Sequence, residues 1–361
     1  MKRAHRKLLM LSCAALCSPL LTGRVVAENS SWFSRQTSVP KSEPSKTPQS
    51  KAPAQPRAPS GQSGSSEVEK SIPSMVPVSG DNAAYIAFDQ GQYLTALKLA
   101  EEEAKRGEPT AYTLMGRIYG DGLGVPKDDS KAYTNYAKAA ELGDVQGTFE
   151  AGVALAEGRG VKKNRKVAAE LFEKAALTGH AEANYNLGLL FLKGDGKPQN
   201  PIRAFQHIQY AAQKGLAQAQ YDLAELYQTG TGTEPNALEA ARWLSRAAEQ
   251  GLTAAQYDYA VRLLQGFGLT KDESKIPMLM RAAADKGVPG AQNRMAYLYL
   301  DGIKVKKDLV EAAKWRLIAK KNGFADKTLD TMVAKLPQAE RRKAATEASA
   351  WNDKIRVGEA Q

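Results

Sequence analysis

Two stretches, AEANYNLGLLFLKGDG (residues 181–196) and AFQHIQYAAQKG (residues 204–215), decide the fold, because their pattern recurs every 36 residues. The glycine that closes the second stretch and a small residue within the first both keep this step. The closing glycines are Gly143, Gly179, Gly215, Gly251, Gly287 and Gly323. The small residues are Gly116, Gly152, Gly188, Ala224, Ala260 and Ala296. Since a fixed period of about 20 to 50 residues is the signature of a repeat array, we predict six repeats over residues 111–326.

Each unit is predicted to be a helix hairpin. In the first unit, apolar residues at helical spacing occupy residues 110–120, and a second such stretch occupies residues 131–142. Gly122 and Gly124 between them supply the positive φ that a helix stop and a tight turn need. Asp128 is placed to cap the second helix. Because a single hairpin cannot bury its own apolar face, the units are expected to stack into an all-α solenoid.

These units resemble the sel1-like repeat, a relative of the tetratricopeptide repeat. The resemblance is carried by the two stretches above, by AAQYDYAVRLLQGFGLTKD (residues 254–272), and by a Gly-x-Gly loop in five of the units. It implies a right-handed α-solenoid of helix-hairpin repeats that binds protein partners, although such folds serve many partners. Two units depart from the pattern. Ile276-Pro277 predicts a late or kinked second helix in the fifth unit, and Gly302-Ile303-Lys304 predicts a different turn in the sixth.

The N-terminal part of the sequence has a different composition from the repeats. Residues 1–27 show the basic, apolar and small-residue order of a secretory signal peptide, with cleavage expected after Ala27. Retention of this segment as an anchor is the alternative. Residues 28–80 are rich in proline and serine and are expected to form a disordered linker, either a spacer or a docking peptide.

The repeats are expected to be closed at both ends. Residues 81–110 are predicted to form a degenerate N-terminal hairpin, and residues 327–361 are predicted to form capping helices with a tail. In the C-terminal segment, Ala345, Ala348 and Trp351 are predicted to form the apolar stripe that packs on the last repeat.

Charge and cysteine usage bear on location. The formal net charge is +11, and cleavage removes five basic residues and no acidic one, which gives +11 − 5 = +6. Cleavage also removes both cysteines, as suits an oxidising compartment, so we expect a periplasmic or secreted protein. The basic runs at 162–166, 304–307 and 341–343 are expected to be solvated surface, with an anionic surface or wall polymer as an alternative partner. An envelope location argues against nucleic acid.

No catalytic residue, cofactor site or metal site is expected. Only His180 and His207 remain after cleavage, and their spacing fits no metal site. His180 is predicted to face solvent in a turn and His207 to pack within a helix, and neither accompanies a nucleophile. Sel1-like proteins linked to β-lactam binding or hydrolysis carry a cysteine pair in each repeat. The mature protein has none, so an envelope hydrolase is the weakest alternative.

A partner is expected on the concave surface lined by the first helices, by analogy with tetratricopeptide repeats. Three residues before each small packing residue stand Thr113, Phe149, Tyr185, Tyr221, Tyr257 and Asn293. The four consecutive aromatic rings would suit a bound peptide, or they would pack between neighbouring units, and both alternatives stay open. Arg117 and Glu225 lie one helical turn further on and complete the candidate site.

These observations favour a non-enzymatic scaffold or regulator in the bacterial cell envelope. The protein partner and its pathway are not specified by the sequence. A secreted factor that binds host proteins is the second hypothesis.

Overall fold

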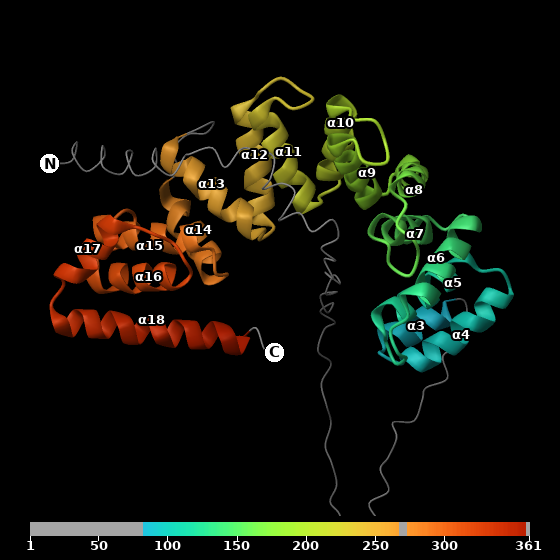
Figure 1. The fold of residues 1–361 in the computed structure, drawn as a ribbon, viewed down its shortest axis with the longest axis horizontal. Helices are drawn as coiled ribbons and strands as arrows, with labels where there is room; N and C mark the ends of the chain where they lie inside the picture. The colour runs from blue at the N-terminus through green and yellow to red at the C-terminus, as the bar shows by residue number, and fades with distance from the viewer. Residues whose placement is uncertain (1–81, 267–272, 359–361) are drawn as a thin grey trace, which may run out of the picture. The chain divides into compact units, whose positions relative to one another are not determined.

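The computed structural model describes residues 82–266 and 273–358; the predicted signal peptide and the whole of the predicted linker lie outside these ranges. The chain divides into two units, Met1–Ile86 and Ala87–Gln361, and the first contributes only the start of α3 (Ala83–Asp89) to the described part. The described residues form sixteen α-helices and no strand, and contacts join consecutive helices of the second unit (Figure 1). The fold is the all-α solenoid that the sequence predicts.

Six hairpins follow one another along the sequence after α4 (Tyr93–Lys105). Their first helices are α5 (Pro109–Asp121), α7 (Val145–Glu157), α9 (Ala181–Lys193), α11 (Ala217–Thr229), α13 (Thr253–Gln265) and α15 (Pro289–Asp301). Their second helices are α6 (Asp129–Glu141), α8 (Arg165–Leu177), α10 (Pro201–Gln213), α12 (Ala237–Glu249), α14 (Ile276–Asp285) and α16 (Leu309–Lys321).

The two helices of a hairpin approach closely where the small residue lies. A Cβ on Gly152 would lie 2.8 Å from the Phe172 ring of the second helix, which explains why a small residue recurs at this position. The hairpin closes through a backbone bond from Asn164 N to the Leu155 carbonyl (2.8 Å). The Asn164 side chain also accepts a bond from Val167 N at the start of α8, as an N-cap residue does.

The loop glycines have two different roles. Gly158 ends α7 in the left-handed conformation, as a helix C-cap. Gly160 also has a positive φ, but its α-carbon faces the preceding repeat, where an added Cβ would overlap the carbonyl oxygen of Asp129 at the start of α6. The second loop glycine therefore sets how closely one repeat approaches the previous one.

The two irregular units behave differently from each other. In the fifth, a 3₁₀ turn (Glu273–Lys275) precedes α14, which begins only at Ile276, so the predicted late start is confirmed. In the sixth, Lys304 takes the left-handed conformation (φ 57°) that glycines adopt elsewhere, so the predicted change of turn is wrong. Lys304 is equivalent to Gly160 by the repeat step, and the residue equivalent to Asp129 is then Glu273, in the 3₁₀ turn rather than at a regular helix start.

The C-terminal segment forms α17 (Lys327–Lys335) and α18 (Gln338–Gly358), both of which contact α16. Trp351 packs edge-on against the buried Trp315 at 5.6 Å between ring centroids, and its Nε1 donates to Asp285 (3.2 Å). The buried alanines of α18 are Ala344 and Ala348, whereas Ala345 is exposed. The predicted stripe was therefore wrong by one residue, because positions 344, 348 and 351 are the ones that share a helical face.

Gly160→Ala is expected to lower the free energy of unfolding by roughly 3 kcal/mol, because it combines left-handed strain with overlap against the preceding repeat. Gly143→Ala is the matched control: its φ is also positive, but nothing lies within 4 Å of the added Cβ. The control should cost only about 1 kcal/mol. Urea unfolding followed by circular dichroism measures both. Equal losses would show that close approach between repeats is not what requires the second loop glycine.

Candidate partner-binding face

The residues predicted to line the partner groove form a column, here called the ladder, with one member on each first helix. Four ladder side chains donate a hydrogen bond to an aspartate of the helix that follows their own hairpin, or of its N-cap. These bonds are Thr113 Oγ1 to Asp144 (2.6 Å), Tyr185 Oη to Asp222 (2.7 Å), Tyr221 Oη to Asp258 (2.7 Å) and Asn293 Nδ2 to Asp326 (2.9 Å). These ladder residues therefore join each hairpin to the helix that follows it, which is the packing alternative left open by the sequence.

The two tyrosine bonds share one geometry. Each hydroxyl donates to an aspartate 37 residues later, one repeat plus one residue, so Asp222 and Asp258 occupy equivalent positions on α11 and α13. Tyr185 and Asp222 are both buried, and burial raises the pKa of the Tyr185 hydroxyl well above its ordinary value. Tyr185 is therefore a neutral donor to a carboxylate, and such charge-assisted bonds are stronger than neutral ones.

Phe149 is the ladder member whose side chain has no polar group. Its ring stacks on His180 at 4.7 Å and lies 5.8 Å from Phe172. The position equivalent to Asp222 in the third repeat is Asn186, which is only 3% exposed and whose Oδ1 accepts no hydrogen bond within the described residues. A buried acceptor therefore remains unsatisfied where Phe149 replaces tyrosine.

The other predicted site residues lie in two separate places. Arg117 is exposed on α5, with its guanidinium 4.7 Å from the Phe88 ring centroid and 3.9 Å from Asp121. Glu225 is half-buried on α11, where burial, and then the charges of Asp222 and Asp258, raise its pKa to about 7. The structure thus brings Glu225 together with the tyrosine–aspartate bonds and leaves Arg117 outside that group.

Burial differs along the row of first helices. In α9 every residue from Ala183 to Phe191 is buried, including Leu189, and Val153 of α7 is buried as well. On α11 and α13, by contrast, five side chains of this row remain partly exposed. These are Tyr221, Glu225, Tyr257, Val261 and Arg262, here called the α11–α13 face. A partner can reach the predicted row on this face more readily than on α9, and Phe149 of α7 is also partly exposed.

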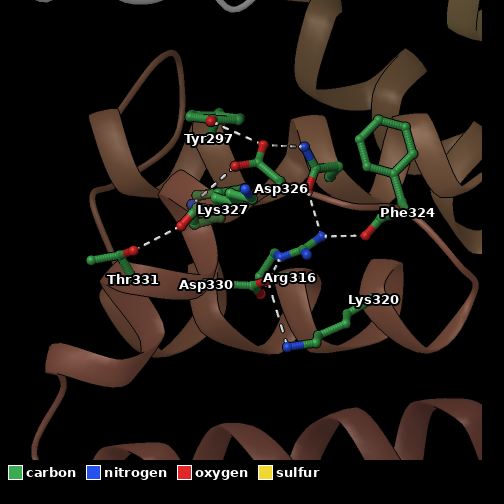
Figure 2. A network of polar contacts seen from close by, with 10 residues as sticks. Tyr297, Arg316, Lys320, Phe324, Asp326, Lys327, Asp330 and Thr331 are labelled. Carbon is green, nitrogen blue, oxygen red and sulfur yellow. Dashed lines mark hydrogen bonds and ion pairs between the residues drawn. The ribbon is translucent and has the colours of Figure 1, made fainter.

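A second polar network closes the array at its C-terminal end (Figure 2). Arg316 of α16 is 1% exposed, at a position where earlier repeats carry apolar residues. Its guanidinium donates to Asp330 (2.8 Å), Asn293 (3.1 Å) and the Phe324 carbonyl (2.8 Å). The hydrogen bond from Arg316 lowers the pKa of Asp330. Asp330 lies three 36-residue steps after Asp222. An aspartate at the equivalent position therefore accepts a hydrogen bond again, here from Arg316 and not from a tyrosine.

The histidines are structural in different ways. His180 was predicted to face solvent, and this is wrong: its Nδ1 caps α9 by accepting from Ala183 N (3.2 Å), and burial lowers its pKa. Stacking on Phe149 explains the difference, because it draws the imidazole off the surface. His207 packs parallel to Phe191 with 5.7 Å between the rings, which confirms the prediction.

The described ranges contain no group of three or more His, Cys, Asp or Glu side chains arranged to hold a metal ion. Within the same ranges, no helix combines the length and the apolar character needed to cross a membrane.

The repeat pattern matches one known family. The Sel1 repeat matches six consecutive segments that together cover more than half of the sequence: residues 109–144, 145–180, 181–216, 217–252, 253–288 and 289–324. The chain belongs to the Sel1 repeat family. Sel1 repeat proteins are generally protein–protein interaction scaffolds, and their solenoid is typically not catalytic. The matched frame begins two residues before the predicted one.

Two solved structures are similar to this Sel1 repeat protein. A Sel1 repeat protein from Oxalobacter formigenes has 27% sequence identity and a TM-score of 0.58, and the match covers 69% of this chain and 100% of that one. A protective antigen of uropathogenic Escherichia coli that displays an SLR fold has 25% identity and a TM-score of 0.50, over 76% of this chain and 69% of that one. No match was found among curated proteins.

Three residues of the site, Asp222, Asp258 and Asn186, were not predicted, although all of them follow the 36-residue step one residue after the ladder. The offset of 37 between tyrosine and aspartate was a usable signal. An offset of 37 residues pairs a residue of one unit with a residue of the next unit. The predicted ladder, by contrast, was found by comparing equivalent positions, which are 36 residues apart.

Phe149→Tyr is expected to stabilise this Sel1 repeat protein by about 1 kcal/mol, since the new hydroxyl can donate to the buried Asn186 as Tyr185 does to Asp222. Urea unfolding measures the gain. In an Asn186→Leu background the same substitution should give no gain. An equal gain in both backgrounds would mean that ring packing, rather than the hydrogen bond, is responsible.

The contribution of Asp222 and Glu225 to the stability of the array should rise as the pH falls from 7.5 to 5. Burial raises the pKa of Asp222 from 3.8 to about 6 and that of Glu225 from 4.5 to about 7. Between these values the folded protein binds more protons than the unfolded protein, so folding is favoured at the lower pH. We expect these two groups to contribute roughly 2 kcal/mol.

The double variant Asp222→Asn with Glu225→Gln should lose this part of the pH dependence, whereas Glu249→Gln on the exposed end of α12 should keep it. Urea midpoints at pH 5 and pH 7.5 test the difference. If the double variant and the wild type have the same pH slope, the two carboxyl groups do not hold extra protons in the folded state.

Proposed function

We propose that this protein is a non-catalytic scaffold of the cell envelope that holds a protein partner against the α11–α13 face. One observation carries the proposal: this face keeps Tyr221, Tyr257 and Val261 partly exposed, whereas the equivalent Tyr185 and Leu189 of α9 are buried. Aromatic rings with a polar tip, beside charged groups, are typical of the residues that dominate binding energy at protein interfaces.

The envelope location rests on the sequence of residues 1–27, which has the order of a signal peptide. The mature protein would carry no cysteine, in keeping with an oxidising compartment. The proline-rich residues 28–80 would then form a spacer on the N-terminal side of the repeats.

A secreted factor that binds host proteins is the second candidate function. It is favoured by the similarity to the protective antigen of uropathogenic Escherichia coli. Recovery of the protein from culture medium rather than from the cell envelope would favour this candidate over the first.

An anionic wall polymer is a further proposed contact. Lys162 and Lys163 are exposed at the turn between α7 and α8, Lys166 is exposed in the first turn of α8, and no acidic residue lies in that first turn. Clustered positive charge attracts anionic polymers at long range, and salt screens this attraction.

Crosslinking in intact cells, followed by pull-down through a C-terminal tag and mass spectrometry, tests the scaffold proposal. The wild-type protein should recover one dominant envelope protein. Val261→Lys should lose it, because the substitution places a charge on the α11–α13 face. Leu238→Lys is the matched control, since Leu238 is an exposed apolar residue (42%) on the second helix α12.

Two outcomes would contradict the proposal. One is recovery of the same partner by Val261→Lys at wild-type yield, with circular dichroism showing an intact fold. The other is recovery of the tagged protein alone from wild-type cells when crosslinking is efficient.

A further inference from the structure

Glu225 of α11 has no counter-charge within the part of the chain that the structure describes. Its side chain is half-buried, yet among those residues the carboxylate forms no hydrogen bond and no ion pair. Burial raises its pKa to about 7, and the charges of Asp222 and Asp258 add to the rise. A carboxylate that is partly removed from water is stabilised by a neighbouring cation. No described cation is paired with Glu225.

The basic residue of the same face, Arg262, is directed elsewhere. Its Nη1 donates to Gln228 Oε1 (2.9 Å). Burial raises the pKa of Asp258, and the bond from Tyr221 and then the charge of Arg262 oppose that rise. The α11–α13 face and the two aspartates that neighbour it thus hold three acidic residues and one basic residue. This is a local excess of negative charge in a chain whose formal net charge is +11.

The two aspartates are already used as hydrogen-bond acceptors within the array. Asp222 accepts from Tyr185 (2.7 Å), and Asp258 accepts from Tyr221 (2.7 Å). Asp222 is moreover only 5% exposed. Glu225 is therefore the carboxylate of this group that a partner can reach and whose oxygens accept no bond from the described residues.

The surroundings of Glu225 suit a long side chain with a charged end. Tyr221 lies one helical turn before it on α11, and burial, then Asp258 and then Glu225 raise the pKa of the Tyr221 hydroxyl. Val261 occupies the equivalent position on α13, one 36-residue step later, and both of these neighbours are partly exposed. A lysine or arginine can pack its apolar stem on such side chains while its charged end meets the acid.

We propose that the partner polypeptide lays a basic side chain over Tyr221 and Val261 of the α11–α13 face and pairs it with Glu225. The ammonium or guanidinium group would supply the missing counter-charge as a charged donor to the carboxylate. Lysine and arginine share this chemistry, and the test distinguishes them. The inference rests on the proposed function, because it names the group by which the partner is recognised on that face.

Nuclear magnetic resonance on the full-length protein with ¹³C-labelled glutamate tests the proposal through the side-chain carboxyl signal of Glu225. The measurement is made at pH 8, above the raised pKa of about 7, so that the group is ionised. The probes are acetyl-Ala-Lys-Ala-amide, acetyl-Ala-Arg-Ala-amide and acetyl-Ala-Gln-Ala-amide. At least one basic peptide should shift this signal saturably and bind at least about 10-fold more tightly than the glutamine peptide. The tighter of the two identifies the basic side chain.

Variants assign the effect to the residue, with binding measured by isothermal titration calorimetry and the fold checked by circular dichroism. Glu225→Gln should lose the preference for basic peptides, whereas Glu249→Gln on the exposed end of α12 should keep it. Val261→Lys should also lose the preference, because the new ammonium group would itself pair with Glu225.

Three results would each overturn the proposal. The first is the absence of a saturable shift of the Glu225 signal in the wild-type protein. The second is equal binding of the glutamine peptide and the basic peptides. The third is an undiminished preference for basic peptides in folded Glu225→Gln.

The two proposals fail separately. If the pull-down recovers a partner that Val261→Lys loses but no basic peptide binds, the scaffold function stands and the Glu225 site is wrong. If basic peptides bind in a Glu225-dependent way but no partner is crosslinked, the site stands and the scaffold function is wrong.

Discussion

The close approach of the loops of the second, third and fourth repeats to the preceding repeat is the constraint on which the structure depends. The α-carbon of Gly160 faces the Asp129 carbonyl so closely that no side chain fits between them, and Gly196 and Gly232 face Arg165 and Pro201 in the same way. Because this contact is made of backbone on both sides, it fixes the distance and the register between neighbouring hairpins independently of their side chains. The first helices can then vary in sequence while their ladder residues still meet partners one repeat later.

Much of the fold follows directly from the sequence. Glycines at a 36-residue step specify where helices end, and Asn164 or Asp128 before a second helix specifies where it begins, since both act through local backbone geometry. The late start of α14 is likewise encoded locally, by Pro277. Lys304 was misjudged because glycine was treated as necessary for a positive φ, whereas here a lysine adopts it in the one unit that follows an irregular 3₁₀ turn.

The candidate site was less predictable, since its chemistry arises between repeats. Tyr185 and Tyr221 were identified correctly as members of one column, but their aspartate partners become visible only when consecutive units are aligned with an offset of one residue. The burial of α9 and the partial exposure of α13 could not be inferred from the sequence, because both helices carry similar apolar residues. Likewise, nothing in the spacing of His180 indicated that it would stack on Phe149.

The buried Arg316 has a consequence for how such an array changes in length. In the other repeats the equivalent position is apolar, so those hairpins can each be followed by another of the same kind. Arg316 needs Asp330 and the Phe324 carbonyl, which only the segment leading into α17 provides. A duplicated hairpin would thus be accommodated between existing repeats but not after the sixth. Gain or loss of repeats in the course of evolution is therefore expected within the array, with the C-terminal end inherited as a fixed unit.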